Sequence, residues 1–246
     1  MRNVVIILIL IMPIINIDRK FQTMHLRDEP KDDCLEINKI NDFEITGVGA
    51  SEEWEKAEWT IIPHRQIAGE GLKTKVKILY SESGIYFLFH CEDKKLTATM
   101  NEDFMDLWTE DVVEVFLWPD EAFPVYFEYE ISPLNYELPI IVSNENGDLV
   151  RWQPFHYDQN RRTRHATSIE GGSKESNAII KGWIAEFFIP YTLLRPLNNI
   201  PPQSGTKWRA NFYRVDYDGT EKKSWSWKLT TKTFHDYEKF GIILFK

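Results

Sequence analysis

Acidic side chains are the most frequent candidates for chemistry in this chain. Glu110, Asp111 and Glu114 lie within five positions of one another, and Glu128 and Glu130 alternate along a later apolar segment. Two carboxyl groups at a set separation are the minimum machinery for hydrolysis of a glycosidic bond. The chain contains 38 Asp and Glu residues, so such pairs are also expected by chance. A glycoside hydrolase or lyase is therefore kept as an alternative.

A tryptophan beside these acids points to binding instead. Trp108 stands just before the strand-like segment 112–118. At such a loop-to-strand junction the indole can offer an apolar face to the C–H surface of a pyranose. The carboxylate of Glu114, six positions later, can accept hydrogen bonds from sugar hydroxyls. These contacts are the ones that a sugar needs, but the pair alone does not predict a site, because most of the 9 Trp side chains are expected to lie in the core.

The composition of the chain and the motifs that it lacks exclude several other classes of function. The net charge of -9 opposes binding to a phosphate backbone, so nucleic acid is not expected as a partner. The basic run 161–165 is interpreted as a solvated loop. No Gly-x-Ser-x-Gly, His-Glu-x-x-His or Gly-x-x-x-x-Gly-Lys motif occurs. Aromatic residues make up 14% of the chain, which predicts a folded core.

Short β-rich segments between turn signals must position these side chains. Hairpins are predicted from 76–80 with 85–91, and from 140–143 with 149–152. Adjacent strands are predicted at 112–118 and 125–131, and alternation places Glu128 and Glu130 on one face. Further strands are expected at 178–190, 207–215 and 242–245, with one helical turn at 191–194. Because no helical periodicity is sustained, we predict an all-β antiparallel sandwich, immunoglobulin-like or jelly-roll-like, with little helix.

The N-terminus predicts export. Arg2 precedes an apolar run over 4–15 that is too short to span a bilayer comfortably, so 1–17 is interpreted as a secretory signal, with an uncleaved anchor as the alternative. A flexible lead over 18–34 and one β domain over 35–246 are expected, in a secreted, periplasmic or cell-surface protein. There Cys34 and Cys91 could form a disulfide, or Cys91 could be a buried thiol.

Several blocks, in their order along the chain, resemble the family 9 carbohydrate-binding modules, within the DOMON-like β-sandwiches. Residues 107–116 are similar to the W-x-x-D-x-V-E-x-F block of sugar-binding members, and 183–190 to W-x-A-E-x-x-I-P. Residues 205–214 resemble G-x-x-W-r-x-N-f-y-R, and the Ser-Trp-Ser-Trp of 224–227 resembles the family's ending. Ser132 stands where the common pattern has Asn. The resemblance covers 45–245.

This resemblance implies a non-catalytic domain that holds a sugar ring between two tryptophans. They would be Trp108 and Trp227, with Trp225 competing for the second position. Polar groups that contact the hydroxyls would be Glu114, Asn211 and Arg214. Glu186 and Arg214 are also interpreted as forming a partly buried ion pair or hydrogen bonds to strand ends.

The resemblance also implies partners and cofactors. A mono- or oligosaccharide is the expected ligand, and a carbohydrate-active enzyme the expected protein partner. Structural calcium occurs in the family, and the oxygen donors here include Asp93, Asp103, Asp106 and Asp111, but no spacing assigns ligands. Haem b, held by Met100 or Met105 with His90 or His156, is an alternative found in DOMON-like relatives. A surface interaction domain without a sugar ligand is the last alternative.

Overall fold

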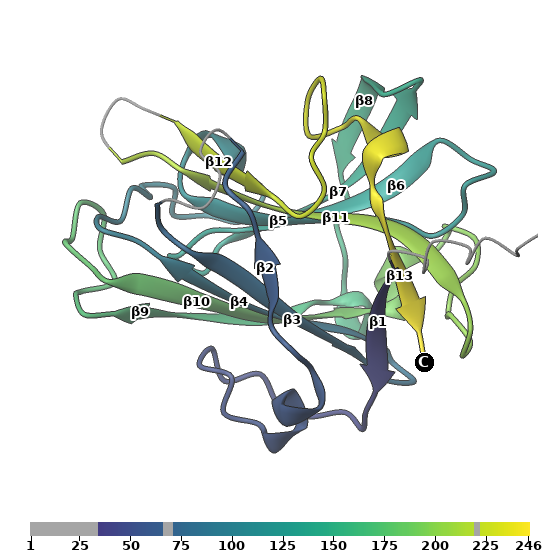
Figure 1. Ribbon diagram of the computed structural model, residues 1–246, viewed down its shortest axis with the longest axis horizontal. Coiled ribbons are helices and arrows are strands. Elements are labelled where there is room, and N and C mark those ends of the chain that lie inside the picture. Colours follow the sequence, from purple (N-terminus) through teal and green to yellow (C-terminus); the bar gives the residue numbers. More distant parts are fainter. Residues whose placement is uncertain (1–33, 66–70, 219–221) are drawn as a thin grey trace, which may run out of the picture. The chain divides into compact units, whose positions relative to one another are not determined.

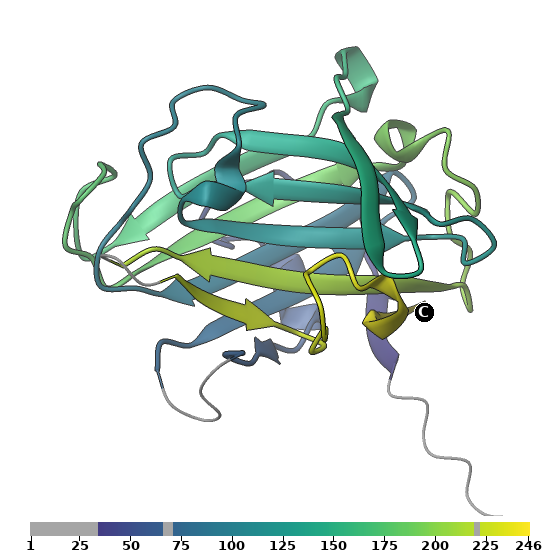
Figure 2. The same cartoon turned by 90° about the horizontal axis from the view of Figure 1, so that it is seen from above.

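Alternating side chains along the strands build two facing sheets. The computed structural model describes residues 34–65, 71–218 and 222–246. Within these ranges 13 strands form one hydrogen-bonded sheet that folds into two layers, with β12 and β2 branching from its main path (Figure 1). The layer called here the β5 sheet has the order β8 (Asp148–Pro154), β7 (Glu137–Glu145), β6 (Val125–Ile131), β5 (Val112–Trp118), β11 (Lys207–Asp216) and β13 (Gly241–Phe245). β12 (Lys223–Ser226) lies beside β11, as Figure 2 shows.

The facing layer, the β4 sheet, has the order β3 (Thr74–Tyr80), β4 (Gly84–Glu92), β10 (Gly182–Pro190) and β9 (Arg164–Glu170), with β2 (Thr60–Ile62) beside β3. In the described part of the chain, helix is confined to single turns: α1 (Tyr191–Leu194) and the 3-10 turns η1 (Glu52–Lys56), η2 (Leu107–Thr109), η3 (Gln159–Arg161) and η4 (Tyr237–Lys239). The predicted all-β sandwich with little helix is confirmed.

The first strand, β1 (Cys34–Lys39), belongs to both sheets. Its residues 34–37 pair in parallel with 242–245 of β13, and its residues 38 and 39 pair in parallel with 79 and 80 of β3. All other strand pairs among the described residues are antiparallel. β1 thus closes one edge between the layers and is the exception to the antiparallel pattern.

The main core lies between the sheets. Val113 and Val115 of β5 point inward, and the phenyl rings of Phe87 on β4 and Phe187 on β10 stack with centroids 5.1 Å apart. Alternation then sends the intervening side chains of each sheet outward. Those outward side chains are also covered, because a loop segment crosses each outer face.

Residues 40–59 cover the outer face of the β4 sheet (Figure 1). Glu186 of β10 is fully buried there, and its carboxylate accepts hydrogen bonds from the amides of Gly47 and Gly49 and from the indole N–H of Trp54. Gly47 has φ of 80°, and a Cβ there would lie 2.9 Å from that of Ala166. The buried carboxylate of Glu186 therefore fixes the covering segment 40–59 through hydrogen bonds to the backbone of that segment.

The sequence located most strands but missed four. The hairpins of β3 with β4 and of β7 with β8, and the adjacent β5 and β6, are confirmed. β1, β2, β9 and β12 were not predicted. The basic run was wrong as a purely solvated loop, because Arg164 opens β9 and its guanidinium carbon lies 4.3 Å from the ring centroid of Phe188. Guanidinium groups pack on aromatic faces in this way.

The remaining N-terminal predictions concern residues that are not placed. The signal (1–17) and all but the last residue of the lead (18–34) lie outside the described residues. No helix in the described ranges is long and apolar enough to cross a membrane. No disulfide joins Cys91 to Cys34; Cys91 is a buried thiol in β4, and burial raises its pKa to about 12.

Candidate functional site

Three glutamates share the outer face of the β5 sheet. Val113, Val115 and their inward neighbours fill the main core, so Glu114 of β5 and Glu128 and Glu130 of β6 point to the opposite side. Glu114 lies directly across from Glu130 in the strand register. The predicted shared face of Glu128 and Glu130 is confirmed, since both line one pocket together with Glu114.

The segment that follows β12 crosses this face (Figure 1). Three of its residues, Thr233, Phe234 and His235, line the pocket. Phe234 stacks on Tyr213 with ring centroids 4.1 Å apart and planes 9° apart. His235 is fixed on both sides: its Nδ1 lies 2.7 Å from the hydroxyl of Tyr126, and its carbonyl accepts from the amide of Asn144 at 2.7 Å. These contacts convert an open sheet face into a walled site.

The pocket has a volume of about 430 Å³, within the range of small-molecule sites. Its apolar lining consists of Trp108, Ile140, Leu149, Trp152 and Phe234. Its cationic rim consists of Arg65, Lys222 and Lys232. Trp108 and Glu114, which the sequence predicted to act together, line the same pocket. A floor of acids under aromatic walls can hold a ligand that is apolar on its faces and polar at its edges.

Trp108 and Trp152 form an apolar corner at the mouth. Trp108 lies in the single turn η2, and its carbonyl accepts a hydrogen bond of 3.2 Å from the hydroxyl of Tyr217. The edge of one indole meets the face of the other, with centroids 5.4 Å apart and planes 76° apart. Sequence reasoning missed Trp152, because it lies on β8, an edge strand whose side chains are mostly exposed and show no alternation.

The glutamates are buried, and burial dominates their protonation. It raises the pKa of Glu114 from the ordinary 4.5 to about 8, against the lowering effect of the charge on Lys222. Burial and the charge of Glu114 raise the pKa values of Glu128 and Glu130 well above the ordinary value. Burial also lowers the pKa of His235 to about 4, so this imidazole is neutral at pH 7. The pocket floor therefore holds protons in the free domain.

This arrangement predicts an inverted pH dependence of stability. Between pH 4.5 and about 8 the folded domain retains protons that the unfolded chain has released, so the free energy of unfolding falls as the pH rises. Glu130→Gln removes one such titration and should flatten the slope, stabilising the domain by about 1–3 kcal/mol at pH 8. Urea denaturation at pH 5, 6.5 and 8 measures both slopes. Glu82→Gln, on the surface, is the control, and equal slopes for Glu130→Gln and the unmodified domain would contradict the prediction.

The other predicted sugar-binding residues lie elsewhere. The indoles of Trp225 and Trp227 pack against the main core, on the side of the β5 sheet that faces the β4 sheet. Trp225 is 1% exposed, and Trp227 stacks on Phe212 at 5.0 Å between centroids. Asn211 is buried, and both ends of its amide group bind the backbone of Lys228. The pocket lined by Trp108 includes none of these three.

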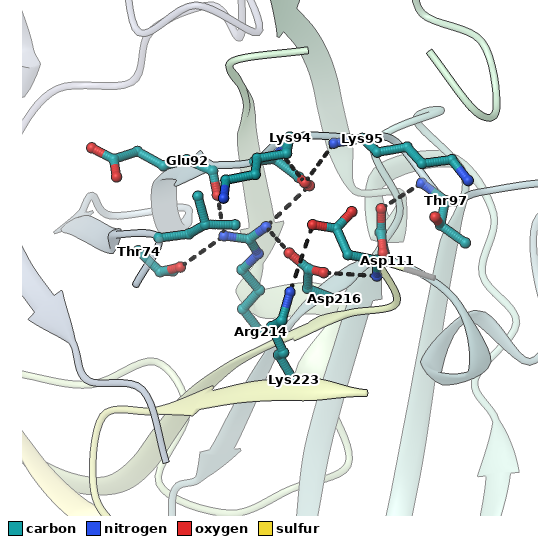
Figure 3. Close-up of polar contacts among 12 residues, drawn as sticks. Thr74, Glu92, Lys94, Lys95, Thr97, Asp111, Arg214, Asp216 and Lys223 are labelled. Carbon is teal, nitrogen blue, oxygen red and sulfur yellow. Dashed lines mark hydrogen bonds and ion pairs between the residues drawn. The ribbon is translucent and has the colours of Figure 1, made fainter. Parts of the chain in front are cut away.

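Arg214 is buried between the sheets in a polar network (Figure 3). Its Nη2 lies 3.0 Å from Asp93 Oδ2 and 2.8 Å from Asp216 Oδ2, and its Nη1 donates to the carbonyl of Glu92 at 2.6 Å. The guanidinium carbon also lies 4.5 Å from the ring centroid of Trp225. Arg214 of the β5 sheet therefore binds the end of β4 in the opposite sheet. It does not form an ion pair with Glu186.

The same network bears on the calcium prediction. Asp93, Asp216 and Asp218 place ligand atoms within 4.8 Å of one another, and of the four acids named from the sequence only Asp93 belongs to this group. Arg214 contacts Asp93 and Asp216, and Lys223 Nζ lies 3.7 Å from Asp218. These cations account for the cluster as an ion-pair network, and calcium stays a prediction.

The residues named for haem also have contacts of their own. His90 Nε2 lies 3.1 Å from a carboxylate oxygen of Glu170, and the ring of His156 stacks on Phe104 with centroids 4.2 Å apart. Neither histidine lines the pocket of Trp108, and nor does Met100 or Met105.

The fold and the pocket define a class: a two-sheet β-sandwich with an aromatic, acid-floored pocket outside one sheet. More specifically, the chain belongs to the carbohydrate family 9 binding domain-like family, whose model matches residues 45–246. The resemblance noted from the sequence is confirmed.

Solved structures share the fold at low identity. A crystal structure of a Bacteroides uniformis protein matches with a TM-score of 0.71 and 17% identity, over 87% of this chain and 99% of that one. A family 9 carbohydrate-binding module from Caldicellulosiruptor kristjanssonii, in complex with cellotriose, matches with a TM-score of 0.61 and 17% identity, over 86% and 93%. A family 9 module from the same organism, in complex with glucose, also matches with a TM-score of 0.61 and 17% identity, over 86% and 95%.

A sequence relative is known from a fungus. An "Extracellular protein" of Arthroderma benhamiae is 28% identical in an alignment of 152 residues that covers 58% of this chain and 63% of that protein. The match thus spans under two thirds of the relative's length.

Proposed function

We propose that this chain is a non-catalytic carbohydrate-binding domain and that its sugar site is the pocket between Trp108 and the glutamate floor. The single observation that carries the proposal is that Trp108 and Glu114, the two residues of the family's sugar-binding block, line one pocket. Membership of the family and the likeness to a module solved with glucose and cellotriose support it.

In this proposal one pyranose face lies on the indole of Trp108. A ring between two parallel aromatic faces needs a spacing of about 7–8 Å, twice a carbon–carbon contact. Trp108 and Trp152 meet edge to face at 5.4 Å, so they offer a corner rather than a slot. Phe234 lines the same pocket from the crossing segment. We therefore propose the corner and Phe234, in place of Trp227, as the apolar walls.

The polar edge of the sugar would face the floor. Burial raises the pKa of Glu114 to about 8, so at neutral pH its carboxyl is largely protonated and both donates to and accepts from sugar hydroxyls. Sugar hydroxyl groups also donate and accept hydrogen bonds, so they can pair with the protonated carboxyl of Glu114 in both roles. The neutral His235 beside Glu128 extends this polar lining.

The compartment and partner follow from the same proposal. An extracellular, periplasmic or cell-surface location agrees with the name of the fungal relative and with the N-terminal sequence. There the domain would bind a mono- or oligosaccharide and bring a carbohydrate-active enzyme to it.

Calorimetric titration of the domain with glucose, cellotriose and a panel of other mono- and oligosaccharides tests the proposal. Binding in the micromolar to millimolar range is expected, because stacking supplies only a few kcal/mol beyond the cost of association. Sugar analysis after the titration should show no hydrolysis. If no sugar gives heat while the domain is folded, the proposal fails, and released reducing ends would favour the hydrolase alternative instead.

A further inference from the structure

The floor of the pocket contains more acid than a neutral sugar requires. Glu114, Glu128 and Glu130 are 3%, 3% and 1% exposed. The carboxyl groups of Glu128 and Glu130 contact each other, and the backbone amide of Trp108 approaches Glu130. Among the described residues, however, no hydrogen bond of normal geometry reaches Oε2 of Glu128 or either carboxylate oxygen of Glu130. Burying a polar group without a partner costs free energy, and most such groups in folded proteins are satisfied. Two adjacent acids with one loosely placed backbone amide leave these buried oxygens short of donors, and because both residues line the pocket they point to a ligand that donates hydrogen bonds.

The cations around the pocket do not supply those donors. The guanidinium of Arg65 donates to the hydroxyl of Thr230 at 2.8 Å and to its carbonyl at 3.0 Å. The ammonium of Lys232 lies 3.3 Å from Asp148, outside the floor. The ammonium of Lys222 lies over Tyr217, 5.6 Å from the ring centroid.

The remaining groups that face the floor are neutral at pH 7. Nδ1 of His235 lies 3.8 Å from Glu128 Oε2, and burial holds its pKa near 4. Burial raises the pKa values of the Tyr126 and Tyr213 hydroxyls, so both keep their protons. Among the described residues no lysine or arginine lies within 4.0 Å of the floor glutamates.

A metal ion is a poor occupant of this floor. Within the described ranges the acidic, histidine and cysteine groups whose ligand atoms converge within 4.8 Å are Asp93, Asp216 and Asp218, which lie in the Arg214 network. The floor glutamates are spread more widely than a metal's ligand shell. A compact organic cation whose body also packs on tryptophan fits the combination of floor and walls.

We infer that the pocket selects a sugar carrying a free amino group, such as a 2-amino-2-deoxyhexose. This inference rests on the proposed function and names the ligand class of the same site. The pyranose body lies in the Trp108–Trp152 corner, and its ammonium donates hydrogen bonds to the unpartnered oxygens of Glu128 and Glu130. Hydrogen bonds between charged groups are about twice as strong as neutral ones, and an ammonium has three donors.

Binding of an ammonium should release protons. The buried carboxyls hold protons in the free domain, and a cation beside them favours their ionised form. The proton of a floor carboxyl then leaves to solvent as the ion pair forms. A neutral sugar, in contrast, binds the protonated floor and should release none.

Calorimetry at pH 7 with glucosamine, glucose and N-acetylglucosamine tests this inference, in two amine-free buffers of different ionisation enthalpy. Glucosamine is expected to bind at least about tenfold more tightly than the other two, with net proton release seen as a buffer-dependent heat. Glu130→Gln should bring the ratio of glucosamine to glucose affinity towards one. Glu128→Gln is the second floor variant, and Glu82→Gln on the surface is the matched control, which should keep the ratio.

The outcomes separate the two proposals. Equal affinity for glucosamine and glucose, both lost in Trp108→Ala, would overturn the amino-sugar inference and leave the sugar site intact. Failure of every sugar to bind would overturn both. A preference for glucosamine that survives in both floor variants would place the ammonium elsewhere and overturn the inference.

Discussion

Replacing Trp108 by alanine should weaken the binding of glucose and cellotriose by about ten- to a hundredfold. Removing an aromatic side chain from the centre of a binding site commonly costs about 1–3 kcal/mol, and 1.4 kcal/mol corresponds to tenfold. Here the loss also opens the corner, since Trp152 loses the indole that it meets edge to face. Calorimetric titration measures the change, and urea denaturation checks that the variant folds.

Two further tryptophans serve as comparisons. Trp59→Ala removes an indole on the opposite sheet, where it contacts the ammonium of Lys75 at 4.3 Å, and should leave sugar binding unchanged. Trp227→Ala removes the ring stacked on Phe212 and should lower stability more than affinity. If Trp227→Ala stays folded yet abolishes binding, the two-tryptophan sandwich predicted from the sequence is right and the corner is not.

Replacing Arg214 by methionine should destabilise the domain by about 3–5 kcal/mol. Removing one partner of a buried ion pair leaves the other charge uncompensated, and that cost is typically of this size. Asp93 and Asp216 would both lose their guanidinium contacts, and the carbonyl of Glu92 would lose its donor. Urea denaturation at pH 7 measures the loss.

The matched controls distinguish charge from packing. Arg151→Met removes an exposed guanidinium on β8 and should change the unfolding free energy by less than about 0.5 kcal/mol. Arg214→Met combined with Asp93→Asn and Asp216→Asn should recover part of the loss, because no buried charge is left without a partner. An Arg214→Met domain as stable as the unmodified one would show that the network contributes nothing net.

The sequence predicted most of the strands and, within them, which side chains share a face, because both follow from local alternation. Val113 and Glu114 had to lie on opposite sides of β5, and Glu128 had to share a side with Glu130. Local pattern therefore sorted side chains into two sets for each strand.

Which set faces the ligand could not be predicted from alternation. It depends on the segment after β12, which crosses the outer face of the β5 sheet and brings Phe234 and His235 over the glutamates. Family blocks placed Trp108 and Trp227 in one site, but Trp227 lies past the end of β12 and stacks on an inward phenylalanine. Trp152 gave no signal, since an exposed edge strand shows no apolar period.

The double membership of β1 has a mechanical consequence. Its residues 34–37 run parallel to 242–245 of β13, so a pull on the chain before Cys34 against the chain after Phe245 acts along both strands in opposite directions. Such a load shears the whole ladder at once instead of opening it one hydrogen bond at a time. The remaining residues of β1 share the force with β3. Tension along the chain would thus meet its strongest resistance at the two strands through which it enters and leaves the domain.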